Sequence, residues 1–358
     1  MLRRVPVLFL GALALFAGLA GGLARLGMAI PAPDLAHTHG ALMVGGFLGT
    51  VIGLERAVAL KRGWAFLAPA LAGLGGLALL AGAPAAAGAA LLVAGSAGLA
   101  AVAGLVALRQ RALFTAMMAL GALAWLGGNI LWLAGRPFPA VVPFWIAFLV
   151  LTIGGERLEL SRLLRPTPTR RITAPLPLAL VLAALVLMAA DAAAATAGWL
   201  FGAGLLAFTV WLCTYDAARR TVRQPGLTRF IGTCLLSGYV WLGIAGLVWL
   251  AGGSPAAGST AYDAALHAVF LGFVFAMIFG HAPVIVPSVL GVEIPFNPWF
   301  YAHLTLLHGS LALRLAGDAA GWDAARHWGG AGNVAAILLF LVLTVNMAVR
   351  GRRLRAKR

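Results

Sequence analysis

The chain has 358 residues, of which 62% are hydrophobic and only 10% are charged, with a mean hydropathy of +0.97. Soluble domains carry roughly 25% charged residues, so this composition excludes a soluble domain and predicts a protein surrounded by lipid. The net charge of +16 does not indicate nucleic-acid binding, because the basic residues flank apolar segments, where anionic lipid headgroups are the expected partners.

Apolar runs follow one another along the whole chain, and each is long enough to cross a hydrocarbon core of about 30 Å. We therefore predict an all-α membrane protein, with residues 1–358 forming a single transmembrane domain, a bundle of about twelve helices. In chain order the predicted spans cover residues 5–26, 37–58, 64–83, 86–108, 112–134, 139–160, 174–192, 196–216, 230–252, 264–286, 298–316 and 328–349.

Basic residues predict the orientation of these helices, because cytoplasmic loops of membrane proteins carry an excess of Lys and Arg. With the N-terminus inside, all but four of the 26 Lys and Arg residues fall in cytoplasmic segments; the exceptions are Arg25, Arg136, Arg314 and Arg326. We therefore expect a multi-pass protein of a bacterial-type inner membrane with both termini in the cytoplasm. Residues 351–358 then form a basic cytoplasmic tail that suits anionic lipid.

A short motif recurs at the inner ends of the second, sixth and tenth predicted spans. It reads IGLER at 52–56, IGGER at 153–157 and, less closely, IFGHA at 278–282. The third copy places His281 where the first two have Glu55 and Glu156. This period of four helices suggests a pseudo-threefold bundle with these three helices at its centre. Ionisable groups are costly inside a membrane, which favours a functional role for the glutamates, while the alternative is that they are solvated helix ends.

The histidines form two groups along the membrane normal. His37, His39, His267 and His327 lie at the outer ends of predicted helices, and His281, His303 and His308 lie toward inner ends. Neutral imidazole is a common ligand of haem iron, copper and zinc, whereas a hydrogen-bonded structural role is the alternative for each histidine alone. In straight helices His267 and His281 share one face, and only one of His37 and His39 faces the bundle, for which we favour His39 because it lies deeper.

Three glycines give the second span a flat face. Gly45, Gly49 and Gly53 recur every fourth residue below His39. Close packing of small residues between helices explains such a face. With an imidazole above it, the alternative is that the same face lies against a porphyrin.

At these residues the chain resembles the NnrS family, twelve-helix haem- and copper-containing membrane proteins associated with denitrification and nitric oxide stress. The resemblance lies in AHTHGALMVGGFLGTVIG on the second span, LHAVFLGFVFAMIFGH on the tenth and TIGGERLELSRLL on the sixth, together with the topology of the full length. Ala36 and Gly40 replace the bulky residue and the glutamate that usually flank the family's His-x-His, so no role carries over for that glutamate.

A wider similarity is to haem–copper oxidases, whose helices two and ten supply the axial histidines of a low-spin haem near the outer face. His39, or His37, and His267 occupy similar places. The chain lacks the adjacent His-His in helix seven and any histidine in helix six. An oxidase copper site, and oxygen reduction of that kind, are therefore not expected.

The resemblance implies a haem- and metal-binding membrane protein of nitrogen oxide metabolism, or of protection from nitric oxide, with a small gaseous or nitrogen oxide ligand. Neither the residues nor the resemblance names the electron-donor partner or decides whether the protein is an enzyme. We expect His39, with His37 as the alternative, and His267 to hold a haem b. A transporter without haem is the alternative function, because of the repeat and the proline-broken inner end HAPVIVPSVLGVEIPFNP.

A second site is expected toward the cytoplasmic side. Its candidate ligands are carboxylates and imidazoles from the three repeated helix ends and the eleventh span, namely Glu55, Glu156, His281 and His303, with His308 nearby. Such mixed ligands suit copper, non-haem iron or zinc. In the absence of the metal, Arg56 and Arg157 would neutralise the carboxylates.

Overall fold

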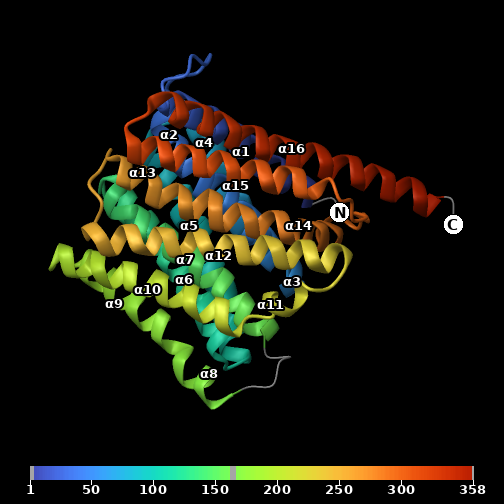
Figure 1. Ribbon diagram of the computed structural model, residues 1–358, viewed down its shortest axis with the longest axis horizontal. Helices are drawn as coiled ribbons and strands as arrows, with labels where there is room; N and C mark the ends of the chain where they lie inside the picture. Colours follow the sequence, from blue (N-terminus) through green and yellow to red (C-terminus); the bar gives the residue numbers. More distant parts are fainter. Residues whose placement is uncertain (1–3, 162–166, 357–358) are drawn as a thin grey trace. The chain divides into compact units, whose positions relative to one another are not determined.

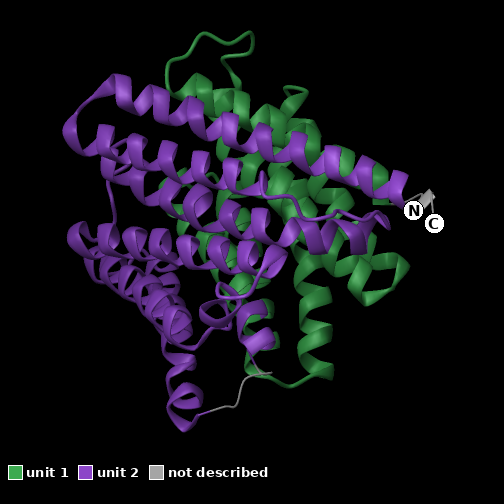
Figure 2. Cartoon of the chain, turned by 45° about the vertical axis from the view of Figure 1, so that its right-hand side comes forward, with its two compact units in different colours: residues 1–155 green, residues 156–358 purple. Residues whose placement is uncertain are grey.

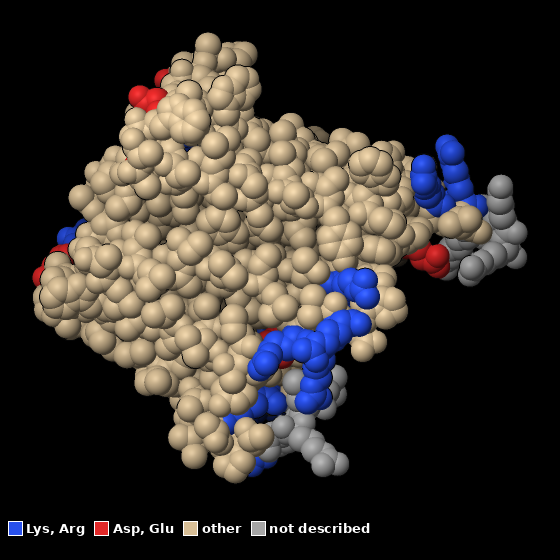
Figure 3. All heavy atoms as spheres, in the orientation of Figure 1, with Lys and Arg blue, Asp and Glu red and all other residues tan. Residues whose placement is uncertain are grey.

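The computed structural model describes residues 4–161 and 167–356, and within these ranges it contains helices and no β-strand (Figure 1). The predicted all-α fold is confirmed. Eleven helical segments of the described chain are long and apolar enough to cross a membrane. The protein is therefore a multi-pass membrane protein, and charged side chains are sparse on the face drawn in Figure 3.

The chain divides into two compact units, Met1–Gly155 and Glu156–Arg358 (Figure 2). The chain passes from one unit to the other within helix α7 (Phe138–Ser161). The sequence predicted a single domain, because apolar spans follow one another on both sides of this division.

Unit 1 contains the first part of α7 and all the helices before it. These are α1 (Arg4–Arg25), α2 (Leu35–Ala41), η1 (Leu42–Gly49), α3 (Thr50–Leu60), η2 (Gly63–Phe66), α4 (Leu67–Leu80), α5 (Ala85–Arg109) and α6 (Leu113–Leu133). The segments α2, η1 and α3 form one continuous span, which packs against α1 and α4. Helix α5 packs against α4 and α6, and Trp125 of α6 stacks on Phe148 of α7 with 4.9 Å between the ring centroids.

Unit 2 contains the last turns of α7 and the remaining helices. These are α8 (Pro168–Thr173), α9 (Pro175–Ala189), α10 (Ala194–Tyr215), α11 (Ala218–Thr221), α12 (Gly226–Gly252), α13 (Thr260–His267), η3 (Ala268–Phe275), α14 (Ala276–Leu290), α15 (Phe300–Ala320) and α16 (Asp323–Ala356). Helix α12 packs against α10, η3 and α14, and α15 lies along α16 (Figure 1). Helix α15 is the eleventh predicted span; it has 21 residues but is too polar to count among the eleven apolar segments.

All twelve predicted spans correspond to helical segments, and the second, sixth and tenth are the most enclosed. The buried share is 67% for Leu35–Leu60, 78% for Phe138–Ser161 and 67% for Thr260–Leu290, whereas no other candidate span exceeds 56%. These are the three helices that carry the repeated motif. The central position that the four-helix period predicted for them stays a prediction.

Two of these enclosed spans contain a π-helical segment. In the second span it is η1, and in the tenth it is η3, each eight residues long. A π-helix closes its hydrogen bonds over five residues instead of four, so its turns are wider. His267 precedes η3 in the chain and His281 follows it. The wider π-helical turns change the rotation between the two residues, so the shared face predicted for a straight helix does not apply to them.

The glycine face of the second span is filled by side chains of unit 1. A Cβ atom at Gly49 would lie 2.2 Å from Cζ2 of Trp125, and one at Gly45 would lie 2.5 Å from Cδ1 of Leu92. A Cβ at Gly53 would meet Pro69 at 3.2 Å. The helix-packing interpretation is confirmed, and the alternative that this face lies against a porphyrin is wrong, because ring and aliphatic carbons already occupy the space.

Helix α14 continues through Pro283 and Pro287 to Leu290. Each proline removes one backbone donor, and the spacing of four residues places both interruptions on the same side of the helix. The helix ends at Gly291, whose φ of +66° belongs to the left-handed region that glycine adopts without strain. The sequence analysis placed the break of this helix at the two prolines, whereas in the structure the helix ends after both of them.

Candidate functional site

His39 lies in α2, shortly before η1, with its ring against α1. Its Nδ1 donates a hydrogen bond to the carbonyl oxygen of Gly18 at 2.6 Å. Because a carbonyl oxygen only accepts, the proton of the neutral ring is on Nδ1 and the lone pair is on Nε2. A Cβ at Gly22 would lie 3.0 Å from Cε1 of His39, so the missing side chain makes room for the ring. His37, two residues earlier, is exposed.

His267 is the last residue of α13 and directly precedes η3. Its Nδ1 donates to the carbonyl oxygen of Asp263 at 2.8 Å and lies 3.3 Å from a carboxylate oxygen of the same residue. That carboxylate is held by Arg314 of α15 through two hydrogen bonds of 2.8 Å each. His267 therefore has the same tautomer as His39, with its lone pair on Nε2.

His39 and His267 share two features, although they lie in different units. Each donates Nδ1–H to a carbonyl oxygen, and each stands just before a π-helical segment. Histidines that bind metals almost always donate their other N–H in this way, and π-helical turns are frequent at functional sites. His327 donates Nδ1–H to the carbonyl oxygen of Asp323 at 2.7 Å, but α16 continues after it as an ordinary α-helix.

His281, in α14, faces an arginine. Its Nδ1 donates to the carbonyl oxygen of Met277 at 2.7 Å, which leaves the lone pair on Nε2. This Nε2 lies 3.5 Å from Nη1 of Arg157. A guanidinium only donates, so Arg157 stands where a metal ion bound to Nε2 would have to be.

Arg157 itself is paired with Asp216, the residue that follows α10. Nε and Nη2 of Arg157 donate to the two carboxylate oxygens at 2.9 and 3.0 Å, a bidentate geometry. The backbone N–H of Ala218 also donates to the carboxylate, at 2.6 Å. Arg157 is 5% exposed and Asp216 3% exposed, so the pair is buried. The sequence analysis expected Arg157 to neutralise the glutamates of the repeat. In the structure its carboxylate partner is Asp216.

His303 lies among phenylalanine rings. Its ring centroid is 4.5 to 5.9 Å from four others, those of Phe230, Phe279, Phe300 and Phe340. The side chain is buried, and within residues 4–161 and 167–356 its Nδ1 has no hydrogen-bond partner. An unsatisfied buried polar atom is unfavourable by about 1–3 kcal/mol and therefore needs an explanation. A metal ligand at this nitrogen is one that fits.

His308 is hydrogen-bonded at both ring nitrogens. The indole N–H of Trp241 donates to Nδ1 at 2.8 Å, and Nε2–H donates to Oγ of Ser237, also at 2.8 Å. Neither nitrogen of His308 is available to a metal ion in this arrangement. The ring connects α15 to α12, which is a structural role.

The two predicted glutamate ligands, Glu55 of α3 and Glu156 of α7, are half-buried and belong to different units. Among the described residues, no three or more His, Cys, Asp and Glu side chains are grouped so that they could hold a metal ion. The inner site as a set therefore stays a prediction. His303 is the member whose surroundings fit a ligand, while the tautomer of His39 and His267 fits axial ligation of haem iron.

A family model described as "Domain of unknown function (DUF8744)" matches residues 4–349. The chain belongs to the DUF8744 family. No curated protein and no solved structure matches the chain. The description of DUF8744 assigns no activity, so the function has to be argued from the geometry of the side chains.

The sequence analysis did not select three charged residues of this DUF8744 protein as site residues, namely Asp216, Asp263 and Arg314. Asp263 precedes His267 by one helical turn, and Arg314 falls inside the eleventh predicted span. These positions were sufficient to select Asp263 and Arg314 as candidate site residues, because charged residues inside membrane helices are rarely without a partner. Asp216 directly follows an apolar span, and its partner is 59 residues away, so no local pattern marks it.

Proposed function

We propose that the protein is a haem-binding membrane protein of the NnrS type, which acts in nitrogen oxide metabolism or in protection from nitric oxide. The observation that carries the proposal is the matched pair His39 and His267. Each is fixed in the same tautomer and followed by a π-helical segment, on the two helices that the resemblance assigns to the axial ligands.

The chain's own groups prepare both imidazoles for an iron ion. The carbonyl oxygen of Gly18 orients His39, and the backbone carbonyl and carboxylate of Asp263 orient His267. The contact with the carboxylate of Asp263 further fixes the orientation of the His267 ring. Arg314 neutralises Asp263 and holds it in place. When bound, haem b supplies a redox-active iron that takes a diatomic ligand.

We also propose a second metal site, for copper or non-haem iron. Its support is the unsatisfied Nδ1 of His303. His281 joins such a site only if Arg157 moves away from Nε2, and His308 is not included, because both of its nitrogens are engaged. We assign no chemical step to this metal.

The membrane is proposed to be the cytoplasmic membrane of a bacterial cell, with both termini inside. The support is the distribution of Lys and Arg between the predicted loops. Fusion of a reporter enzyme that is active only outside the cytoplasm, placed after residue 26 or at the C-terminus, tests the orientation. Activity at the first position and none at the second is the expected result.

The proposal is tested by the absorption spectrum of protein purified from cells supplied with haem. A Soret band and the low-spin electron paramagnetic resonance signal of a bis-histidine haem are expected. His39→Gln and His267→Gln should each abolish the low-spin signal, whereas His327→Gln should keep it, although His327 has the same carbonyl hydrogen bond. Wild-type protein without a Soret band would overturn the proposal and favour the transporter alternative.

A further inference from the structure

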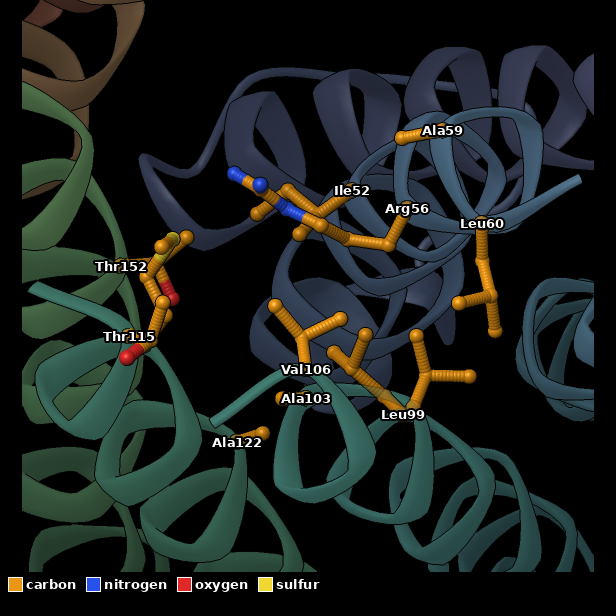
Figure 4. Close-up of a pocket in the computed structure, with 12 residues that line it drawn as sticks. Ile52, Arg56, Ala59, Leu60, Leu99, Ala103, Val106, Thr115, Ala122 and Thr152 are labelled. Carbon is orange, nitrogen blue, oxygen red and sulfur yellow. The ribbon is translucent and has the colours of Figure 1, made fainter. Parts of the chain in front are cut away.

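The cavity drawn in Figure 4 lies within unit 1, between α3, α5, α6 and α7, and has a volume of about 240 Å³. Its walls are mostly aliphatic. Arg56 is the only charged residue among the twelve that line it, and it already interacts within the protein. The cavity therefore offers no free charge that would select an ionic ligand. A buried carboxyl group without hydrogen bonds lies instead in unit 2, on α15.

This carboxyl group belongs to Asp318, in the last turn of α15, two residues beyond the predicted eleventh span. Its side chain is 2% exposed, and neither of its oxygens accepts a hydrogen bond from a residue that the structure describes. Nε of Arg326 on α16 lies 3.1 Å from one oxygen, but the geometry is not that of a hydrogen bond, because this nitrogen also has no acceptor among the described residues. A buried carboxylate without hydrogen bonds is unfavourable and needs an explanation.

A second carboxylate, that of Asp263 on α13, lies within hydrogen-bonding reach of Asp318. Arg314 precedes Asp318 by four residues, so both project from the same face of α15, and Arg314 donates to the two oxygens of Asp263 at 2.8 Å each. Two ionised carboxylates have no hydrogen to share, and they repel each other. Their contact becomes favourable when one of them carries a proton.

The arginines determine which carboxyl group takes the proton. Both oxygens of Asp263 accept N–H groups of Arg314, which favours the ionised form of Asp263. Asp318 has the guanidinium of Arg326 beside one oxygen, and that side chain is half-exposed. Burial and the carboxylate of Asp263 raise the pKa of Asp318. In the protonated form its O–H donates to Asp263, and the missing hydrogen bond is made.

The surroundings of Asp318 contain few other ionisable groups. Within the described chain, three charged side chains act on it, those of Asp263, Arg314 and Arg326. The second half of α12, which packs against α13, has no charged residue. Asp323, at the start of α16, is exposed, and its carbonyl oxygen accepts a hydrogen bond from His327. His267 contacts the carboxylate of Asp263.

We propose that Asp318 is a reversible proton-binding site, which takes up one proton from the aqueous phase at the predicted outer side of the membrane. The O–H of the protonated carboxyl group donates to Asp263, which stays ionised between Arg314 and His267. On release the proton returns to the same phase, and Asp318 then carries a negative charge that Arg326 partly neutralises. The O–H bond is the only bond that forms and breaks.

The site is one carboxylate away from the proposed haem ligand. Asp263 contacts both Asp318 and Nδ1 of His267, so the charge of Asp318 acts on an iron ion bound to that ring. Reduction of the iron adds one electron, and uptake of one proton at Asp318 compensates its charge. This link to the iron rests on the proposed function, whereas the proton-binding site itself does not.

Infrared difference spectra of the full-length protein in detergent test the site. They are recorded between about pH 8 and about pH 5.5, a range above the ordinary pKa of a carboxyl group, about 4. Acidification should produce the C=O band of a protonated carboxylic acid, which shifts in heavy water. Asp318→Asn should lose this band, whereas Asp323→Asn, at an exposed aspartate, should keep it. Protonation of His267 in the same range does not interfere, because an imidazole has no C=O group. A wild type without the band, or an equal band in Asp318→Asn, would overturn the proposal.

A second variant keeps the test decisive if Asp318→Asn does not fold. Arg326→Gln removes a cation that favours the ionised form of Asp318, so the midpoint of the band should move to higher pH by about half a unit or more. Arg223→Gln, at an exposed arginine between α11 and α12, is the matched control and should leave the midpoint unchanged. The same midpoint in Arg326→Gln and wild type would contradict the assignment to Asp318.

Redox titration of haem-loaded protein tests the link to the iron. The midpoint potential of the wild type should fall as the pH rises through the range in which the infrared band disappears, because ionised Asp318 favours the oxidised iron. Asp318→Asn should lack this part of the pH dependence. Equal pH dependence in both proteins would refute the link. A protein that has the infrared band but no Soret band would support the proton-binding site and reject the proposed haem function.

Discussion

Arg157 and Asp216 form a buried ion pair with two parallel hydrogen bonds, although they are 59 residues apart in the chain. The pair joins the last turns of α7 to the end of α10 within unit 2. The third nitrogen of the guanidinium points to Nε2 of His281 on α14. One arginine thus connects three helices near their C-terminal ends and restricts what His281 can bind.

Asp216→Asn should lower the free energy of unfolding by about 3–5 kcal/mol, because it leaves the charge of Arg157 buried without a counter-charge. Thermal unfolding in detergent measures the effect. Asp34→Asn, at an exposed aspartate before α2, is the control and should change little. The double variant Arg157→Met, Asp216→Leu should recover most of the loss, because an apolar pair of similar volume often replaces a buried ion pair at little cost. An unchanged unfolding temperature for Asp216→Asn would contradict the assigned pairing.

His308→Phe should destabilise the protein by about 1–3 kcal/mol, because the indole N–H of Trp241 loses its buried acceptor. Haem and metal content should stay at the wild-type level, since neither nitrogen of His308 is available as a ligand. Unfolding curves and elemental analysis of the same preparation check both parts. Loss of metal without loss of stability would show that His308 is a ligand and that the hydrogen bonds are dispensable.

His303→Phe is expected to behave in the opposite way. In metal-free protein the change should be neutral or stabilising by up to about 1 kcal/mol, because an unsatisfied imidazole among phenylalanine rings is replaced by another apolar ring. After loading with copper, the wild type should gain stability that the variant does not gain. Equal responses of the two proteins to copper would exclude His303 as a ligand.

Gly49→Ala and Gly272→Ala should each destabilise the protein by about 1–3 kcal/mol, because each new methyl group overlaps a tryptophan ring. The added Cβ would lie 2.2 Å from Trp125 in one case and 2.3 Å from Trp241 in the other. Gly104→Ala is the control: a Cβ there meets nothing within 4 Å. It should stabilise α5 by about 0.5–1 kcal/mol, as alanine does in an open helix interior. Thermal unfolding of the three variants, compared with wild type, measures these changes in stability.

The sequence was sufficient for the spans, because length and apolar content are local properties of the chain. It was not sufficient for the partners of Arg157 or His308. These contacts join helices far apart in sequence, and a guanidinium or an imidazole carries no local sign of the residue it will meet. The π-helical segments were missed for a different reason: their residues are as apolar as those of an ordinary helix, so the hydrophobic pattern does not distinguish them.

The division within α7 escaped prediction because hydropathy reports burial in lipid and not contacts between helices. Predicted depth in the membrane also could not decide which histidines are ligands. His39 was preferred to His37 for its depth, and in the structure His39 contacts α1 while His37 is exposed. Ligation by His39 stays a prediction, and its tautomer is the structural feature that supports it.

The π-helical segments also determine the rotational phase between the two ends of their helices. A π-helical turn is equivalent to one residue inserted into an α-helix, and one residue corresponds to about 100° of rotation. Deleting a single residue within η1 would therefore turn α3, with Glu55 and Arg56, by about 100° relative to His39. The same deletion in η3 would turn His281 away from Arg157 while His267 stayed in place. In both helices, the π-helical segment therefore determines how the histidine at one end is oriented relative to the ionisable groups at the other.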